Sequence, residues 1–231
     1  MNSFQTFFSG LDWSVLTDLL LRVIPTLICI TVHECCHGLT AFWLGDDTAK
    51  RAGRLTLNPL RHFDPLGTVM MVAFRFGWAK PVPVNMYRFK NPKTGMALTA
   101  LAGPVSNLLL TLLALFLYGL LYLPLVRAGT GLADFALETL STTAQLSLAL
   151  AVFNLLPISP LDGSKVAFAF LSDRAYARLM RYERYGMIVL VLLSVTGALG
   201  GPLSTAVGWC FDRVFPAAEW GYALGSRLFL S

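Results

Sequence analysis

Long apolar stretches alternate with short polar ones along this chain, and the pattern predicts membrane-spanning helices. A helix crosses a bilayer with roughly 20 consecutive apolar residues. Apolar stretches occupy, in chain order, residues 15–44, 96–126, 136–161 and 185–199, with a candidate fifth at 203–225 that is either a span or an interfacial helix. The sequence therefore predicts an all-α integral membrane protein, a polytopic helical bundle of about four to five spans in a single domain over residues 1–231.

Residues 63–90 depart from this pattern. Residues 63–76 are apolar but too few for a clean span, and the next segment is rich in proline, which disfavours a helix and allows only an edge strand. Non-helical backbone is tolerated at membrane depth only beside protein or a water-filled cavity. We therefore expect a small re-entrant, extended or β-hairpin region, associated with the membrane at its cytoplasmic face.

Composition and charge agree with a membrane protein. Hydrophobic residues make up 55% of the chain and charged residues 13%, against about 25% charged in an average soluble domain. Of the 18 lysines and arginines, nine lie between Lys50 and Lys93 and five between Lys165 and Arg184. Cytoplasmic loops carry such an excess of basic residues, so we place both segments inside the cell and the chain in the cell (inner) membrane. The net charge of +5 does not indicate nucleic-acid binding, because no soluble basic domain with stacking aromatics is visible.

The first apolar stretch contains the sequence His33-Glu34-Cys35-Cys36-His37. Residues four apart lie on one face of a helix, so His33 and His37 can bind one zinc ion, and Glu34 can act as general base toward a metal-activated water. The alternative is a polar helix face with unrelated histidine and glutamate. Ionisable side chains are costly inside a bilayer, and a shared metal gives them a partner. The two cysteines fill the variable positions, where a thiolate ligand is conceivable but packing is favoured.

A catalytic zinc site usually has three protein ligands and an open position. Asp162 is the preferred third ligand, because it is the only carboxylate between Glu138 and Asp173 and lies at the inner end of the third stretch. The alternative for Asp162 is an ordinary Asp-Gly turn that ends a helix. His62 is not preferred, because it lies beside Arg61 in a basic loop and is expected to be solvated or hydrogen-bonded there.

Five motifs in order make the chain resemble the site-2 proteases, in the short bacterial and archaeal branch without a PDZ domain. The motifs are HECCHG at 33–38, NPLRHFDPLG at 58–67, GWAKPVPVN at 77–85, AGPVSN at 102–107 and FNLLPISPLDGSKV at 153–166. The resemblance implies that His33, His37 and Asp162 bind one Zn²⁺ and that Glu34 is the catalytic base. It also implies cleavage of transmembrane proteins near the cytoplasmic side, with membrane-anchored regulators such as anti-sigma factors as substrates.

The resemblance suggests further site residues, each with a structural alternative. Asn107 is a candidate for binding the substrate carbonyl or the developing oxyanion, or it makes an interhelical hydrogen bond. Asn154 orients Asp162 or the substrate, or it satisfies backbone freed by Pro157. The segment formed by Lys80, Pro81, Val82, Pro83, Val84 and Asn85 offers a strand edge to an unwound substrate, or it is a hairpin that covers the zinc site.

The function predicted is therefore that of a zinc-dependent intramembrane endopeptidase. The alternative is a non-proteolytic zinc-binding membrane protein or scaffold, but binding alone does not require the base Glu34. A degenerate protease would be expected to have lost Glu34 or a ligand, and this chain retains them all.

Overall fold

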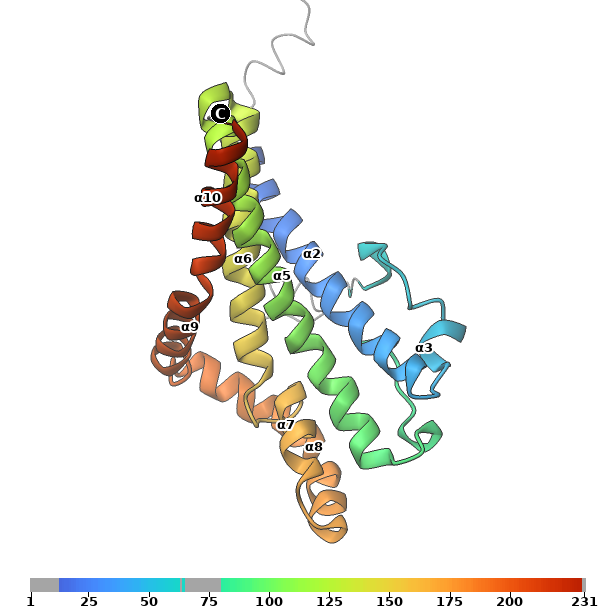
Figure 1. Ribbon diagram of the computed structural model, residues 1–231. Coiled ribbons are helices and arrows are strands. Elements are labelled where there is room, and N and C mark those ends of the chain that lie inside the picture. The colour runs from blue at the N-terminus through green and yellow to red at the C-terminus, as the bar shows by residue number, and fades with distance from the viewer. Residues whose placement is uncertain (1–12, 63, 65–79, 230–231) are drawn as a thin grey trace, which may run out of the picture.

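The computed structural model describes residues 13–62, 64 and 80–229, and helices dominate them (Figure 1). The long helices are α2 (Trp13–Trp43), α5 (Pro92–Ala128), α6 (Gly131–Asn154), α8 (Asp173–Val195), α9 (Gly200–Val214) and α10 (Pro216–Phe229). The short helical elements are α3 (Thr48–Arg51), η1 (Pro59–Arg61), η2 (Met86–Arg88) and α7 (Asp162–Ala169). The predicted all-α architecture is confirmed for the described residues.

Local capping explains why α5 and α6 form an antiparallel hairpin. The side chain of Asn91 accepts a hydrogen bond from the amide of Thr94, and Pro92 supplies the first helical residue of α5. Gly129 ends α5 in the left-handed conformation, at φ 57°, which glycine adopts without a steric penalty. Thr130 then caps α6 through the amide of Ala133. Two residues between the helices are enough to reverse the chain.

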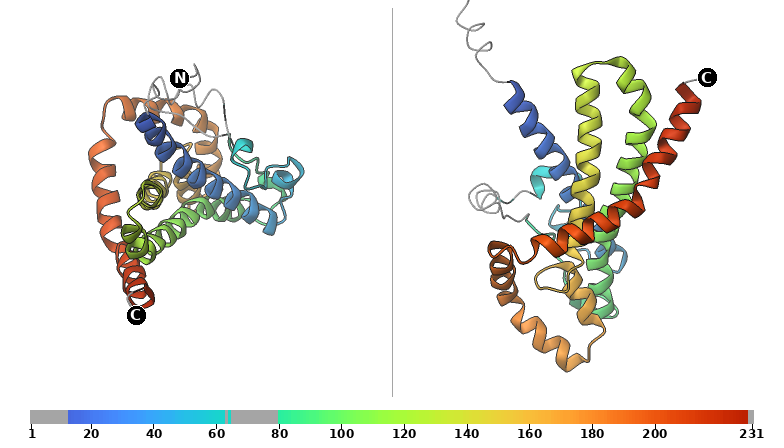
Figure 2. Two further views of the ribbon diagram at one scale, coloured as in Figure 1. Left: turned by 90° about the horizontal axis from the view of Figure 1, so that it is seen from above. Right: turned by 90° about the vertical axis from the view of Figure 1, so that its left-hand side faces the viewer.

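Helix α5 is the centre of the bundle, because α10, α6 and α2 all pack against it (Figure 1). At Gly119 the approach of α10 is so close that a Cβ would overlap the carbonyl of Ala218, as expected where small residues let membrane helices meet. The α5–α6 hairpin and the C-terminal end of α10 lie at one end of the molecule, and α7 and the first half of α8 lie toward the other (Figure 2).

Three of the described helices are long and apolar enough to cross a membrane, at Thr17–Trp43, Pro92–Ala128 and Gly131–Asn154. The residues Tyr185–Val195 and Gly200–Phe229 add a fourth if this pair, bent by 88°, forms one broken span. The described helices therefore supply three or four candidate spans where the sequence predicted about four to five. Helix α6 ends at Asn154 rather than at 161, because Pro157 cannot continue the amide ladder.

The predicted β-hairpin is not supported, since no strand occurs among the described residues. Residues 65–79 lie outside that description, but residues 80–85 lie within it and are extended. Their backbone groups bond to other partners: the Lys80 amide donates to the His62 carbonyl at 3.0 Å and the Val82 amide to Glu34 at 2.9 Å. Pro81 and Pro83 have no amide hydrogen to offer. The Glu34 side chain and the loop at His62 therefore bind the backbone of residues 80–85, where the sequence predicted a neighbouring strand.

Candidate metal centre

Three side chains from two distant parts of the chain converge on one point. The Nε2 atoms of His33 and His37 are 3.0 Å apart, and each lies 3.1 Å from Oδ2 of Asp162. All three residues are at most 9% exposed. They are the one group of possible metal ligands found in the described part of the chain. The structure thus brings together the three ligands that the sequence predicted.

Local structure explains how each ligand reaches this point. His33 and His37 lie one turn apart on α2, so both imidazoles leave the same face. Asp162 is the first residue of α7, where the helix dipole favours a negative charge. Gly163 allows the turn before α7 to pack closely, because a Cβ there would overlap the carbonyls of Leu155 and Leu156.

Helix α5 packs directly against both imidazoles. The Nδ1 atom of His37 lies 2.7 Å from the carbonyl oxygen of Thr99, so Nδ1 carries the hydrogen and donates it. The lone pair on Nε2 of His37 is then free for a metal. Gly103 makes the approach possible, since a Cβ at this position would overlap the rings of both His33 and His37.

The ligand set suits zinc. Bonds of about 2.0–2.1 Å in a tetrahedral site place ligand atoms about 3.3 Å apart, close to the observed separations of 3.0–3.1 Å. A metal at this point would require Asp162 in its ionised form and both histidines without a hydrogen on Nε2.

Glu34 contacts a segment remote from it in the sequence. Its Oε2 atom accepts a hydrogen bond from the Val82 amide at 2.9 Å. Glu34 is partly buried and is not a member of the ligand group, consistent with a base that stands beside the metal. The sequence predicted that residues 80–85 cover the site or offer a strand edge, and the contact between Val82 and Glu34 favours the cover.

Two buried charged residues anchor this segment. The Arg54 guanidinium donates to the carbonyls of Lys80 at 2.6 Å and Pro81 at 3.2 Å, and also to that of Arg61. Asp46 is fully buried and accepts from the Asn85 amide at 2.6 Å. Burial raises the pKa of Asp46, but hydrogen bonds from Thr48 and Asn85 and the charge of Arg88 hold the pKa below its ordinary value.

The two asparagines occupy different positions. Asn107 is fully buried on α5, with its amide nitrogen 3.1 Å from Nδ1 of His33. Asn154 donates to the carbonyl of Leu150 at 3.0 Å, one turn back in its own helix. The Leu150 carbonyl is not a group that Pro157 frees, so this bond does not test the structural alternative for Asn154. The substrate-binding roles of both residues stay predictions.

Cys35 and His62 face a loop. The Sγ atom of Cys35 donates to the Thr56 carbonyl at 2.8 Å, and Nε2 of His62 lies 2.9 Å from the same oxygen. His62 is 2% exposed, so it is hydrogen-bonded rather than solvated, and neither residue belongs to the ligand group.

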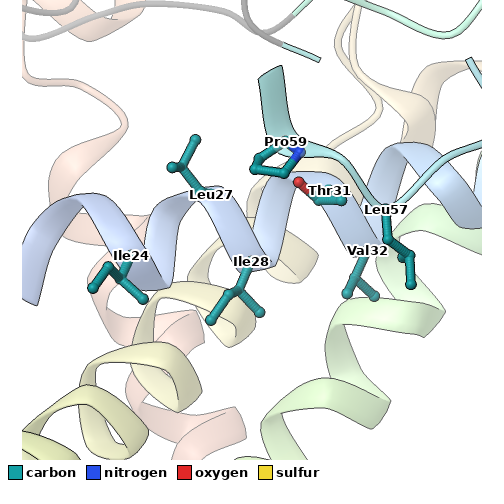
Figure 3. A pocket seen from close by; sticks show the side chains of 7 residues that line it. All are labelled: Ile24, Leu27, Ile28, Thr31, Val32, Leu57 and Pro59. Atoms are coloured by element: carbon teal, nitrogen blue, oxygen red, sulfur yellow. The ribbon is translucent and has the colours of Figure 1, made fainter. Parts of the chain in front are cut away.

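An apolar pocket of about 320 Å³ lies against helix α2 (Figure 3). Helix α2, the loop residue Leu57 and the start of η1 supply its lining, which consists of Ile24, Leu27, Ile28, Thr31, Val32, Leu57 and Pro59. By the helical period, the lining residues of α2 leave this helix on the face opposite His33 and His37. The pocket therefore lies across α2 from the metal ligands.

Sequence reasoning missed the residues that support the ligands. Thr99 acts through its main-chain carbonyl, which has no residue-type signature. Gly103 did have a signal, because it is a glycine inside a predicted helix and within the AGPVSN motif, where close packing is the usual reason.

Two histidines and a carboxylate base on a helix of membrane-spanning length, with a third ligand from the short helix α7, are typical of a membrane metallopeptidase. The profile of peptidase family M50 matches residues 124–196, which include Asp162. The protein named "Putative zinc metalloprotease YwhC" from Bacillus subtilis is 42% identical over 191 residues, covering 81% of this chain and 83% of that protein. Proteins named "Putative zinc metalloprotease Rip2" from Mycobacterium tuberculosis and Mycolicibacterium smegmatis are 30% and 29% identical over 193 residues, covering 80% of this chain and 71% of each relative. No solved structure matches the chain significantly.

These similarities place the chain in peptidase family M50, the site-2 proteases. It is a membrane-embedded zinc metalloendopeptidase, and its cofactor is Zn²⁺.

Proposed function

We propose that this protein is an intramembrane endopeptidase that cleaves membrane-anchored proteins within or near the bilayer. The observation that carries the proposal is the position of His33, Glu34 and His37 inside Thr17–Trp43, a helix of membrane-crossing length and hydropathy. Ionisable groups at that depth face the protein interior and mark function. A peptidase of soluble substrates has no need to place its ligands there.

The chain's own residues supply positioning and proton transfer. His33, His37 and Asp162 hold the metal, and Zn²⁺ when bound supplies a Lewis acid that makes water nucleophilic near neutral pH. Glu34 receives the proton of the attacking water at its carboxylate and returns it to the amine that leaves. The products are one new carboxylate and one new amine. The Val82 amide fixes the orientation of the carboxylate through Oε2.

A peptide bond inside an intact helix is shielded by the helix's own hydrogen bonds. A transmembrane substrate must therefore unwind locally and enter the site as an extended segment. We place this segment beside residues 80–85, which contact Glu34 and are themselves extended. Membrane-anchored regulators, including anti-sigma factors, are the substrates proposed from the family resemblance.

The site lies toward the cytoplasmic side of the cell membrane in this proposal. Lys50, Arg51 and Arg54 follow α2 directly, and Lys90 and Lys93 lie at the start of α5. Basic residues concentrate in cytoplasmic loops. The end of α2 nearest His37 would then face the cytoplasm.

Metal content and cleavage, measured on purified wild type and Glu34→Ala in parallel, test the proposal. A panel of single-span membrane proteins serves as substrate, and Glu138→Ala, at an exposed position of α6, is the matched control. We expect about one zinc per chain in all three proteins, with cleavage by wild type and Glu138→Ala alone. Equal cleavage by Glu34→Ala would refute the role of the base. Zinc binding without cleavage by any protein would favour a non-proteolytic zinc-binding protein.

A further inference from the structure

Asn107 is buried at the centre of α5 and fixed there by its neighbours. It is 0% exposed, and its main-chain carbonyl accepts hydrogen bonds from the hydroxyls of Thr111 at 2.9 Å and Ser147 at 2.8 Å. Its side-chain amide points at His33, with Nδ2 placed 3.1 Å from Nδ1 of the imidazole. The amide oxygen, also buried, has no hydrogen-bond partner within the described chain. A buried polar atom of this kind calls for an explanation.

The tautomer of His33 decides which end of the amide belongs at this contact. Nε2 of His33 faces His37 and Asp162, and it can bind a metal only without its hydrogen. The neutral imidazole then carries the hydrogen on Nδ1, which needs an acceptor. An amide NH₂ group cannot accept this hydrogen, whereas an amide oxygen can.

A half-turn of the amide satisfies both groups, because its two ends have nearly the same size and shape. We propose that the Asn107 amide oxygen accepts the Nδ1 hydrogen of His33 and thereby holds His33 in the metal-binding tautomer. Asn107 is then a positioning residue, which acts on the metal through His33.

The support for His37 shows the same arrangement. Its Nδ1 atom is 2.7 Å from the Thr99 carbonyl, so α5 also supplies the acceptor for the second imidazole. Thr99, Gly103 and Asn107 are spaced four residues apart and therefore share one face of α5. One face of a single helix thus provides an acceptor for each histidine, with a glycine between them that makes room for both rings.

Asn107 reaches His33 at Nδ1, whereas the ligand atom is Nε2, on another edge of the ring. This inference deepens the proposed function, because it rests on the same metal centre. It also predicts a different experimental effect from the oxyanion role predicted for Asn107. A positioning residue affects metal affinity without substrate, whereas an oxyanion donor affects only the rate of cleavage.

The test is the affinity of purified protein for Zn²⁺, measured by competition with a chelator and without substrate. Asn107→Leu removes the acceptor, and Asn107→Asp retains an acceptor of the same shape. Thr143→Val is the matched control, since it removes a buried hydroxyl on α6 that donates to the carbonyl of Thr139 in its own helix. The absorption spectrum of the Co²⁺ form provides a second readout of ligand geometry.

Loss of an outer hydrogen-bond partner typically lowers metal affinity by about 10- to 100-fold, and we expect this loss for Asn107→Leu. Asn107→Asp is expected to bind Zn²⁺ at least as tightly as wild type, with an unchanged Co²⁺ spectrum, and Thr143→Val to match wild type. If Asn107→Leu does not fold, Asn107→Asp alone decides, because weakened binding there would overturn the inference. If Asn107→Leu binds Zn²⁺ as tightly as wild type but cleaves more slowly, the inference is also overturned, in favour of the oxyanion role. The expected affinities without cleavage by any variant would preserve the inference and count only against the proposed function.

Discussion

The two sides of the site are built in different ways. On the metal side, His33, His37 and Asp162 project from α2 and α7 and are backed by one face of α5. On the side of the base, Glu34 meets residues 80–85, which form neither helix nor strand. Arg54 and Asp46 hold that segment from outside the membrane-length helices.

This difference separates binding from turnover. Packed helices hold ligand atoms to within tenths of an ångström, as a metal site requires. An extended segment held by a few side chains can shift when a substrate binds. We therefore expect changes on the α5 side to alter metal affinity and changes in residues 80–85 to alter cleavage while the metal stays bound.

Asp162→Ala should have the largest effect. It removes the only negatively charged ligand, so zinc content should fall from about one per chain to near zero, and cleavage should fall to background. Metal analysis after dialysis checks this, with the exposed residue Asp134 changed to alanine as control. Full zinc retention in Asp162→Ala would remove Asp162 from the ligand set.

Gly103→Ala should weaken the binding of Zn²⁺. Its new methyl group would overlap both imidazoles, and such overpacking costs about 1–3 kcal/mol. We expect about 10-fold weaker Zn²⁺ binding, which corresponds to about 1.4 kcal/mol. Gly131→Ala is the control, because a Cβ there meets nothing within 4 Å among the described atoms. Equal affinities in the two variants would show that α5 does not press on the histidines.

Val82→Pro removes the amide hydrogen that Glu34 accepts, whereas Val82→Ala retains it. A hydrogen bond to a charged group is worth about 1.5–3 kcal/mol. Cleavage by Val82→Pro should therefore fall by about 10- to 100-fold with zinc content unchanged, and Val82→Ala should remain close to wild type. Steady-state kinetics with parallel metal analysis measures both. A loss of zinc in Val82→Pro would erase the distinction between the two sides.

Asp46→Asn should lower the stability of the fold. The pKa of Asp46 is lower in the folded protein than its ordinary value of 3.8. Its ionised form therefore stabilises the fold above that value, and this contribution disappears as the pH falls through the lower folded pKa. We expect Asp46→Asn to lose about 1–3 kcal/mol at pH 7, with the difference from wild type shrinking only below about pH 4.

Thermal unfolding at several pH values measures this difference. Asp47→Asn is the control, because Asp47 is more exposed and pairs with Arg51 and Arg88 at the surface, where an ion pair is worth about 0–1 kcal/mol. Equal losses in the two variants at pH 7 would mean that Asp46 does not anchor residues 80–85 more strongly than a surface pair would.

Much of the site could be predicted because its chemistry depends on residue type. The spacing of His33 and His37 is a helical signature, and Asp162 stood out as a carboxylate in an apolar region. The contacts of Thr99 and Val82 could not be predicted, because any residue offers a carbonyl and most offer an amide. The β-hairpin was predicted from extended-chain propensity, but propensity does not reveal that Arg54, Asp46 and Glu34 would bond to that backbone instead.

The sequence by itself determined the helical class of fold and identified the candidate metal ligands and base, because hydropathy and side-chain chemistry are local properties. Only the tertiary structure decided that α5 orders both histidines, that Asn107 faces Nδ1 of His33, and that residues 80–85 rest on Glu34. These relations join residues far apart in the chain, often through main-chain atoms common to all residues. They exist only once the helices have packed.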